Sequence, residues 1–571
     1  MTITQEIVAI LYRISEMLEI KGIQWEPIAY SKAARNIESL SENLADIYKR
    51  GGIKALMEIP GIGKGIAGNI EEYIKTGKIK KYDELKKSIP VDIESLNTVE
   101  GLGPKKIMLL YKKLKIRNLA DLQKAAQQGK LRKLPGIREK TEENILKAIE
   151  FSKKSSERKL LGYALPLARE IQALLRKQPY IHRVEIAGST ARRKETIGDI
   201  DILITTSSPQ KAMDFFTSLP EIKRVIAKGA TKSTVVYEDM QVDCRVLHPE
   251  EFGSALQYFI GSKDHNVAVR RIAISKGYKL SEYGLFKGTK RIAGKTEDEI
   301  YQKLGMQWPP PELRENHGEV EAALKHSLPK LVELKDIQGD LHMHTTYSDA
   351  KNTVEEMASA CKALGYSYCA ITDHVSPMGI AYGLTMEKLK KQRKEIDAVN
   401  KKLSDFTVLH GAEVDIKLNG ELFAKEKMLK EFDIVLASIH QGMQRTKEEQ
   451  TKRMLKAMDN KYLNIICHPT GRKINKRPGY ELDFEKVFNA AKENNVFLET
   501  NSQHIRLDLS DVNARAAKDS GILISVNTDA HAVDQLDSME YGISTVRRAW
   551  CTKKDILNAL PLNELLRRIK R

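Results

Sequence analysis

From residue 339 onward, short apolar runs alternate with helical segments, and each run ends in polar residues. The runs occupy residues 369–372, 407–409, 434–438, 463–467, 496–499 and 523–528. Such an alternation is typical of parallel strands joined by crossover helices. It predicts six or seven βα units that form a barrel, with the polar strand ends on the face where barrel active sites lie.

Histidines are concentrated in the same region. Eight of the 13 histidines lie after residue 336, most of them at the predicted strand ends, with carboxylates beside them. Imidazole and carboxylate without thiolate suit Zn²⁺, Mn²⁺ or Fe²⁺, and ligand softness does not choose among these ions. A single histidine is more often structural than a ligand, but the ensemble predicts a metal centre.

The middle of the chain has a different pattern. Short β-rich runs at residues 184–187, 200–205, 235–237 and 242–247 are separated by helical segments, which predicts an α+β domain. Asp199 and Asp201 are two residues apart on one predicted strand and therefore project from the same face, where Asp243 can join them from a neighbour. Three clustered carboxylates repel one another unless cations lie between them, so we expect two Mg²⁺ or Mn²⁺ ions here.

A glycine-rich segment precedes this pair of aspartates and reads Gly188-Ser189-Thr190-Ala191-Arg192-Arg193. The turn and one of the two arginines can hold the β and γ phosphates of a nucleotide. A bare Asp-x-Asp is more often a strand edge at the surface; the preceding segment and the third aspartate favour a nucleotidyl transfer site.

The amino-terminal region predicts helices with repeated glycine turns. Gly61 and Gly63 form one apolar-Gly-apolar-Gly turn, and Gly101 and Gly103 form a second, followed by a helix at Lys105. A weaker third copy surrounds Gly136. Such a turn points backbone N–H groups and a helix amino terminus at one spot, which suits a DNA phosphate. These repeats resemble helix-hairpin-helix elements.

The composition agrees with a polyanionic partner. The net charge is +18 and most of the basic excess precedes residue 337, which favours nucleic acid. Five cysteines without a Cys-x-x-Cys spacing suit a reducing compartment. We find no signal peptide or apolar membrane span, and we expect a cytoplasmic protein with no membrane partner.

The middle domain resembles the polymerase-beta-like nucleotidyltransferases through its glycine turn and three aspartates. Tyr258-Phe259-Ile260-Gly261-Ser262, with Asn266 and Arg270, resembles the segment by which family X DNA polymerases contact the incoming nucleotide and the template. The resemblance implies that Tyr258 and Phe259 screen the sugar, Asn266 meets the base, and Arg270 contacts the template strand.

The carboxy-terminal region resembles the polymerase and histidinol phosphatase (PHP) family, whose distorted seven-stranded barrel binds three metals. The resemblance implies nine ligands: His342, His344, Asp349, His374, Glu413, His440, His468, Asp529 and His531. His410 and His504 match no ligand position and are expected to be structural or to support the ligands. Arg472 and Lys473 are expected to bind the scissile or terminal phosphate.

Together these segments resemble a bacterial or archaeal family X DNA polymerase with a PHP domain, over nearly the whole chain. The resemblance implies gap-filling synthesis in base excision repair on gapped or nicked duplex DNA with dNTPs. It also implies a Mn²⁺-stimulated 3′–5′ exonuclease in the PHP domain, with activity at abasic sites or on 3′ blocking groups in some members. The position of the lyase lysine found in some relatives is Asn69 here, which cannot form an imine; Lys64 is the neighbouring lysine, and we do not expect a strong lyase.

The fold we predict is multidomain, with all-α helix-hairpin-helix domains, an α+β palm and thumb, and an α/β (βα)7 barrel. The predicted boundaries are 1–80 and 81–155 for the helical domains, 156–250 for the palm, 251–316 for the thumb, 317–336 for a linker and 337–571 for the PHP domain. We expect a monomer. Two alternatives stay open, namely a phosphatase of small phosphate esters with a nucleic-acid-binding front half, and a non-catalytic repair scaffold.

Overall fold

The chain forms two compact units, which are described one at a time. The first unit comprises residues 1–157, 263–281 and 285–292, and the second comprises residues 158–262, 282–284 and 293–571. The computed structural model describes residues 3–38, 43–88, 91–92, 96, 102, 104–134, 137, 142, 145–146, 149, 158–377 and 383–570. In these ranges, no helix combines the length and the apolar character that crossing a bilayer requires.

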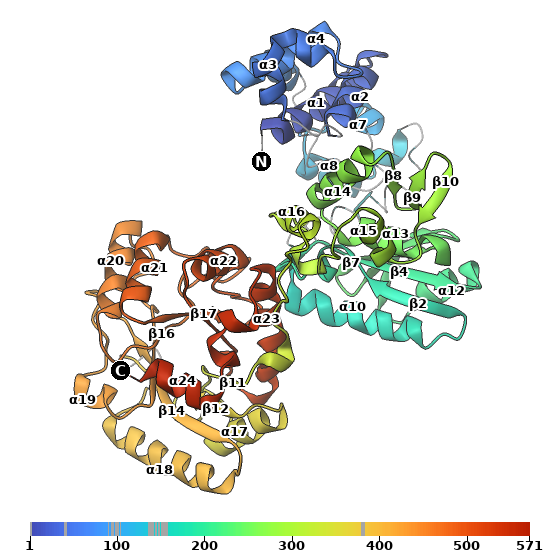
Figure 1. The fold of residues 1–571 in the computed structure, drawn as a ribbon. Helices are drawn as coiled ribbons and strands as arrows, with labels where there is room; N and C mark the ends of the chain where they lie inside the picture. The colour runs from blue at the N-terminus through green and yellow to red at the C-terminus, as the bar shows by residue number, and fades with distance from the viewer. Residues whose placement is uncertain are drawn as a thin grey trace. The chain divides into compact units, whose positions relative to one another are not determined.

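The first unit begins with helices packed around one apolar core, drawn in blue in Figure 1. They are α1 (Ile3–Ile20), α2 (Glu26–Glu38), α3 (Leu44–Met57), α4 (Lys64–Thr76) and α5 (Lys80–Ser88). Apolar residues recur at helical spacing in α1, so that Ile7, Leu11 and Ile14 are fully buried. The predicted helical character of this region is confirmed.

A second, smaller core follows in the same unit. It contains residues of α7 (Pro104–Leu114) and α8 (Leu119–Gln127), including Ile107 and Leu122. The unit also holds α14 (Lys263–Ser275), strand β8 (Lys279–Ser281) and most of strands β9 (Gly284–Lys287) and β10 (Lys290–Ala293), which form a three-stranded sheet.

The second unit opens with the palm, a five-stranded sheet in the order β2-β4-β7-β6-β5. Its strands are β2 (Ile181–Ile186), β4 (Asp199–Thr206), β7 (Met240–Val246), β6 (Lys232–Tyr237) and β5 (Ile222–Lys228). Strands β4 and β7 run parallel, and the other neighbours are antiparallel. Helix α10 (Leu161–Arg176) packs on the sheet through Leu165, Ala168 and Ile171, which are all buried.

The carboxy-terminal part is a barrel of parallel strands in the order β11-β12-β14-β15-β16-β17-β18. The strands are β11 (Gly339–Asp340), β12 (Tyr368–Ile371), β14 (Thr407–Asp415), β15 (Ile434–Ser438), β16 (Ile465–Ile466), β17 (Phe497–Asn501) and β18 (Ile524–Asn527), and a short β13 (His374–Val375) also pairs with β14. A parallel bridge between Met343 and Ala530 joins the chain just after the first strand to the chain just after the last. The predicted barrel is confirmed, and six of its strands overlap the apolar runs found in the sequence.

Helices surround these strands in Figure 1. They are α17 (Val354–Ala363), α18 (Met386–Lys402), α19 (Glu426–Leu429), α20 (Lys447–Met458), α21 (Phe484–Glu493), α22 (Asp511–Asp519), α23 (Met539–Arg548) and α24 (Leu562–Ile569). The strands are buried on both faces, as expected of a parallel sheet covered by crossover helices.

Palm and barrel share one apolar core. Leu507 and Tyr541 of the barrel belong to the same buried cluster as Leu165 and Ile202 of the palm. The segment 317–336 is packed rather than a free linker, because it contains α16 (Glu319–Leu324) and because Val332 is buried in the barrel core. Within the second unit, the two parts therefore form one body.

Candidate metal centres and nucleotide site

Adjacent parallel strands position the three palm aspartates. Asp199 and Asp201 lie on β4, and the register of the sheet pairs Asp201 with Asp243 of β7. Gly188 begins the short helix α11 (Gly188–Ala191) with a φ of 63°, and a Cβ on Gly188 would lie 2.3 Å from Asp201 Oδ2. The glycine turn and the aspartates thus meet at one point, as the sequence predicted.

The three palm aspartates bring negative charges close together. Burial, together with the neighbouring Asp199 and Asp243 carboxylates, raises the pKa of Asp201 to about 7. Burial and Asp243 also raise the pKa of Asp199. Lys232 Nζ lies 2.6 Å from Asp243 Oδ2 and supplies one compensating charge. Such a cluster suits divalent cations.

The two arginines of the glycine segment have protein partners. Arg192 Nε donates to Glu315 Oε1 at 2.9 Å, and a second guanidinium nitrogen donates to the Ile260 carbonyl at 2.7 Å. Burial lowers the pKa of Arg193, and the guanidinium of Arg169 near it lowers it further. Phosphate binding by Arg192 and Arg193 stays a prediction, as does that by Ser189 of α11.

The aromatic pair lies on α13 (Phe252–Ile260), which ends at Gly261. The rings of Tyr258 and Phe259 meet edge to face with centroids 5.0 Å apart, and the Arg245 guanidinium lies 4.8 Å from the Phe259 centroid. Sequence analysis did not single out Arg245.

Asn266 and Arg270 lie on α14 of the first unit. Asn266 is buried, and Arg270 Nε donates to the Asn266 carbonyl at 3.3 Å. These roles at base and template stay predictions.

The first glycine turn has the expected geometry. Gly61 has a φ of 83°, and Gly63 is the N-cap of α4, so the amino terminus of this helix follows the turn directly. Gly101, Gly103 and Gly136 lie outside the described residues, and of Lys105 the structure describes only the backbone at the start of α7. Asn69 donates from its amide Nδ2 to the Tyr30 hydroxyl at 2.7 Å. Its side chain is an amide, so this position has no amine that could form an imine.

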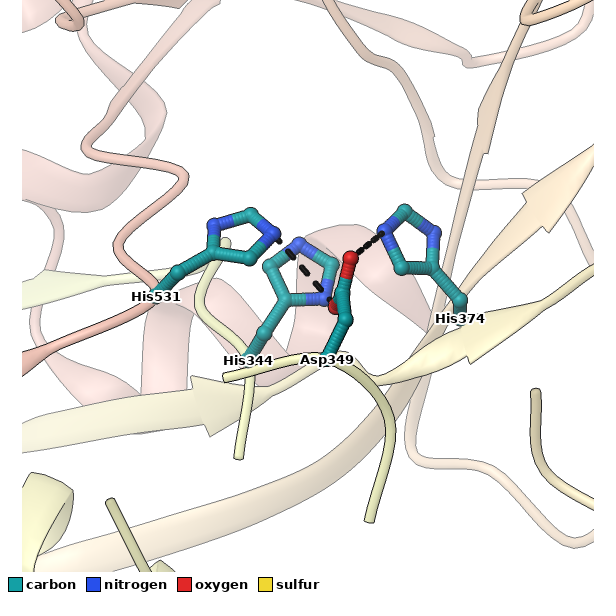
Figure 2. A group of neighbouring side chains, drawn as sticks. All are labelled: His344, Asp349, His374 and His531. Atoms are coloured by element: carbon teal, nitrogen blue, oxygen red, sulfur yellow. Dashed lines mark ion pairs between the residues drawn. The ribbon is translucent and has the colours of Figure 1, made fainter. Parts of the chain in front are cut away.

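The barrel brings all nine predicted PHP ligands together at the ends of its strands. Three groups have ligand atoms within 4.8 Å of one another: His344, Asp349, His374 and His531, drawn in Figure 2; His342, His344 and Asp529; and His374, Glu413 and His440. The ninth residue, His468, joins through its Nε2, which lies 3.1 Å from Glu413 Oε1.

Individual contacts within this centre are short. His342 Nε2 lies 3.2 Å from His344 Nε2, and His344 Nε2 lies 3.2 Å from Asp529 Oδ1. Burial alone would raise the pKa of Glu413, but His374, His440 and His342 hold it well below its usual range. Glu413 is therefore a carboxylate among imidazoles.

Carboxylates behind the centre fix the ring orientations. His342 Nδ1 lies 2.8 Å from Glu499 Oε1, and His440 Nδ1 lies 2.7 Å from Asp415 Oδ1. Each contact engages Nδ1 and directs Nε2 to the cluster, which is the usual outer arrangement at a metal-binding histidine. The donor set of imidazoles and carboxylates therefore fits divalent metal ions, and it suits Zn²⁺, Mn²⁺ and Fe²⁺ alike.

Sequence reasoning missed several residues of this centre. Glu499 and Asp415 end or follow apolar runs, and that position was the signal that could have found them. Cys467 also approaches His342 and Glu499, and burial raises the pKa of its thiol well above the usual value. The side chain of Arg506 is largely buried, and its Nε lies 3.7 Å from Asp529 Oδ2.

Arg472 has protein partners in this structure, and its predicted phosphate contact stays a prediction. Its guanidinium donates to Glu195 of the palm at 2.7 Å and to the carbonyls of Arg506 and Leu507. This arginine therefore joins the barrel to the palm. Neighbouring Lys473 is partly buried, and burial together with Arg506 lowers the pKa of its amine.

The two unassigned histidines have structural contacts. His410 Nε2 lies 2.9 Å from Gln392 Oε1. His504 packs against Gly162 of the palm, where a Cβ on the glycine would lie 2.5 Å from His504 Cγ. Neither belongs to a ligand group among the described residues.

Comparison with known families matches four regions of the chain. A helix-hairpin-helix domain matches residues 3–79, a SAM-like helix-hairpin-helix tandem 93–150, a DNA polymerase beta thumb 255–315 and a PHP domain 340–503. DNA polymerase lambda of Rattus norvegicus is 24% identical over 53% of this chain and 54% of its own length. A probable phosphatase of Thermoanaerobacter sp. (strain X514) is 32% identical over 38% of this chain and 89% of its own length.

One relative spans the whole chain. The DNA polymerase/3′-5′ exonuclease PolX of Bacillus subtilis (strain 168) is 39% identical over 99% of both chains. The helical domains, palm, thumb and barrel thus occur in the same order along a single relative, and the chain belongs to the family X DNA polymerases that carry a PHP domain.

Proposed function

We propose that this chain is a DNA polymerase that fills short gaps during base excision repair and a 3′–5′ exonuclease that trims the primer end. The observation that carries the proposal is the presence of two separate clusters of candidate metal ligands in one chain, one of palm aspartates and one of barrel histidines and carboxylates. The activity in the printed name of the Bacillus subtilis relative supports both halves.

In the polymerase half, Asp199, Asp201 and Asp243 would hold two Mg²⁺ or Mn²⁺ ions. Bound there, such ions would lower the pKa of the primer 3′ hydroxyl and neutralise the triphosphate of a dNTP. Tyr258 and Phe259 screen the sugar, and the helix-hairpin-helix turns hold a gapped or nicked duplex by its phosphates. Asn69 supports the absence of a strong deoxyribose-phosphate lyase.

In the exonuclease half, the nine barrel residues would hold three divalent ions, Zn²⁺, Mn²⁺ or Fe²⁺. Such ions supply hydroxide near neutral pH and stabilise charge on a phosphodiester. Arg506 lies beside Asp529 and is placed to hold a phosphate oxygen. Cleavage at abasic sites and removal of 3′ blocking groups are further reactions that this centre would support.

We also expect a monomer in the cytoplasm. The five cysteines support this location, because all are unpaired and buried, as suits a reducing compartment.

The test uses the purified protein, a 5′-labelled primer in a short-gap duplex and Mn²⁺, with and without dNTPs. We expect extension with dNTPs and shortening without them. Extension alone would overturn the exonuclease half. No change in primer length, with turnover of small phosphomonoesters, would instead favour the phosphatase suggested by the name of the Thermoanaerobacter relative.

A further inference from the structure

A cavity of 390 Å³ opens in the barrel beside the PHP centre. Its walls include Asp415, Lys417, Leu418, Phe423, Gln441 and Arg453. Asp415 Oδ1 lies 2.7 Å from Nδ1 of the predicted ligand His440, and Gln441 follows that histidine directly. The cavity and the metal centre therefore share a wall.

The first wall is a hairpin that continues β14. Ile416 bridges to Leu422 in antiparallel fashion, and the Phe423 amide donates to the Asp415 carbonyl at 2.8 Å. The turn contains Gly420 with a φ of 87°, where a Cβ would lie 2.6 Å from Lys456 Cβ of α20. Packing on α20 thus fixes the position of the hairpin.

The second wall is the chain at Gln441, and a buried arginine joins it to the hairpin. Arg453 of α20 is only 2% exposed, and its guanidinium donates to the carbonyls of Lys417 at 2.9 Å and Gln441 at 2.7 Å, and to that of Ile416. A buried guanidinium is costly unless it is hydrogen-bonded, and here its bonds go to backbone on both walls. The cavity is therefore formed before any ligand arrives.

The rim of this cavity exposes apolar groups. Phe423 is 40% exposed and Leu418 is 49% exposed. An aromatic ring open to solvent in a nucleic-acid enzyme is a stacking surface, because every base has an apolar face. A volume of 390 Å³ is at the lower end for ligand sites and suits a single nucleoside rather than a duplex.

We propose that this cavity binds the base of the 3′-terminal nucleotide, stacked on Phe423, while the phosphodiester of that nucleotide lies at the PHP centre. This inference rests on the proposed exonuclease function. A terminal base must leave its duplex partner to enter the cavity, and an unpaired or mismatched base loses least by doing so. The site therefore selects frayed and mismatched primer ends.

The first test compares two single-stranded oligonucleotides that differ only in their last residue, a normal nucleotide or an abasic tetrahydrofuran residue. We expect Phe423→Ala to raise the KM for the normal end about tenfold and to leave kcat and the abasic end unchanged. Leu364→Ala is the matched control, because Leu364 is 46% exposed and follows α17 at the opposite end of the barrel. Equal losses by Phe423→Ala on both oligonucleotides would overturn the proposal.

The second test does not depend on turnover. An oligonucleotide ending in 5-iodo-deoxyuridine through a phosphorothioate linkage is irradiated with the wild-type holoenzyme and digested with trypsin. We expect the cross-link in the peptide of residues 418–425, and a cross-link confined to other peptides would contradict the site. If the wild type degrades neither oligonucleotide, the exonuclease proposal fails, and this cross-link decides separately whether the cavity binds a terminal base.

Discussion

At the residue scale, Glu315 connects three basic side chains from distant parts of the second unit. Its Oε1 lies 2.9 Å from Arg192 Nε, 3.7 Å from Lys194 Nζ and 3.2 Å from a guanidinium nitrogen of Arg548. Burial alone would raise the pKa of Glu315, but Arg192 and Arg548 hold it below its ordinary value of 4.5. The folded protein therefore binds the proton of this carboxyl less readily than the unfolded chain does.

The stability that Glu315 contributes to the fold therefore depends on pH. Glu315 contributes stability above pH 4.5, and this contribution is lost as the pH falls through the lower folded pKa. We expect Glu315→Gln to lower the free energy of unfolding at pH 7 by about 3 kcal/mol and to flatten its fall in acid. Urea unfolding at a series of pH values between about pH 3 and pH 7 measures the loss of unfolding free energy at pH 7 and its fall in acid.

Glu333→Gln is the control for this prediction. Glu333 pairs with the exposed Lys335, and its side chain also caps the short helix 334–336, a contact that glutamine can keep, so Glu333→Gln is expected to leave the unfolding midpoint nearly unchanged. If Glu315→Gln behaves like this control, the buried network does not stabilise the fold.

The nine predicted ligands followed from the resemblance to the PHP family, and the polar ends of the apolar runs agree with most of them, but no single residue identified itself as a ligand. The position of a supporting carboxylate at the end of an apolar run could mark it as a candidate, but not which histidine it contacts. His342 and Glu499 are 157 residues apart, and nothing local to either predicts their 2.8 Å contact. Arg472 shows the same limit, because its position after His468 indicated a phosphate contact, whereas Glu195 lies 277 residues away.

At the element scale, the turn into α11 determines how closely the backbone approaches the palm carboxylates. The sequence assigned the Gly188 turn and the aspartates to one nucleotidyl transfer site, and the structure supplies the reason for glycine, since a Cβ would lie 2.3 Å from Asp201 Oδ2. Strand β5 was not among the predicted runs. Lys223, Arg224 and Lys228 interrupt its apolar pattern, as is common for edge strands.

We expect Gly188→Ala to reduce primer extension at least about 100-fold, because the methyl group displaces Asp201. Exonuclease activity is expected to stay at the wild-type level. Gly365→Ala is the control, since Gly365 also has a positive φ, 85°, but its Cβ would meet nothing within 4 Å. Extension by Gly188→Ala at the level of this control would show that the turn does not position the carboxylates.

At the scale of the whole molecule, palm and barrel are one body rather than two tethered domains. Arg169 donates to both oxygens of Glu540, at 3.0 and 2.8 Å, across 371 residues of sequence. Composition and periodicity identified both parts, but not this interface, because complementary charges and shapes on folded surfaces leave no periodic pattern.

A double-mutant cycle tests the contact between palm and barrel at Gly162 and His504. Gly162→Ala on α10 would gain about 1 kcal/mol from helix propensity alone, yet its Cβ lies 2.5 Å from His504 Cγ. We expect a net loss of about 2 kcal/mol in unfolding free energy, most of which His504→Ala restores in the double variant. Additive losses in the cycle would mean that the two residues do not meet.

The proposed polymerase and exonuclease activities require two separate metal centres in one chain. The direct measurement follows a 5′-labelled primer in a gapped duplex with Mn²⁺ for two double variants that unfold at the wild-type temperature. We expect Asp199→Ala with Asp201→Ala to abolish extension and leave shortening intact, and His342→Ala with His344→Ala to do the reverse. Loss of both activities in either folded variant would contradict separate centres.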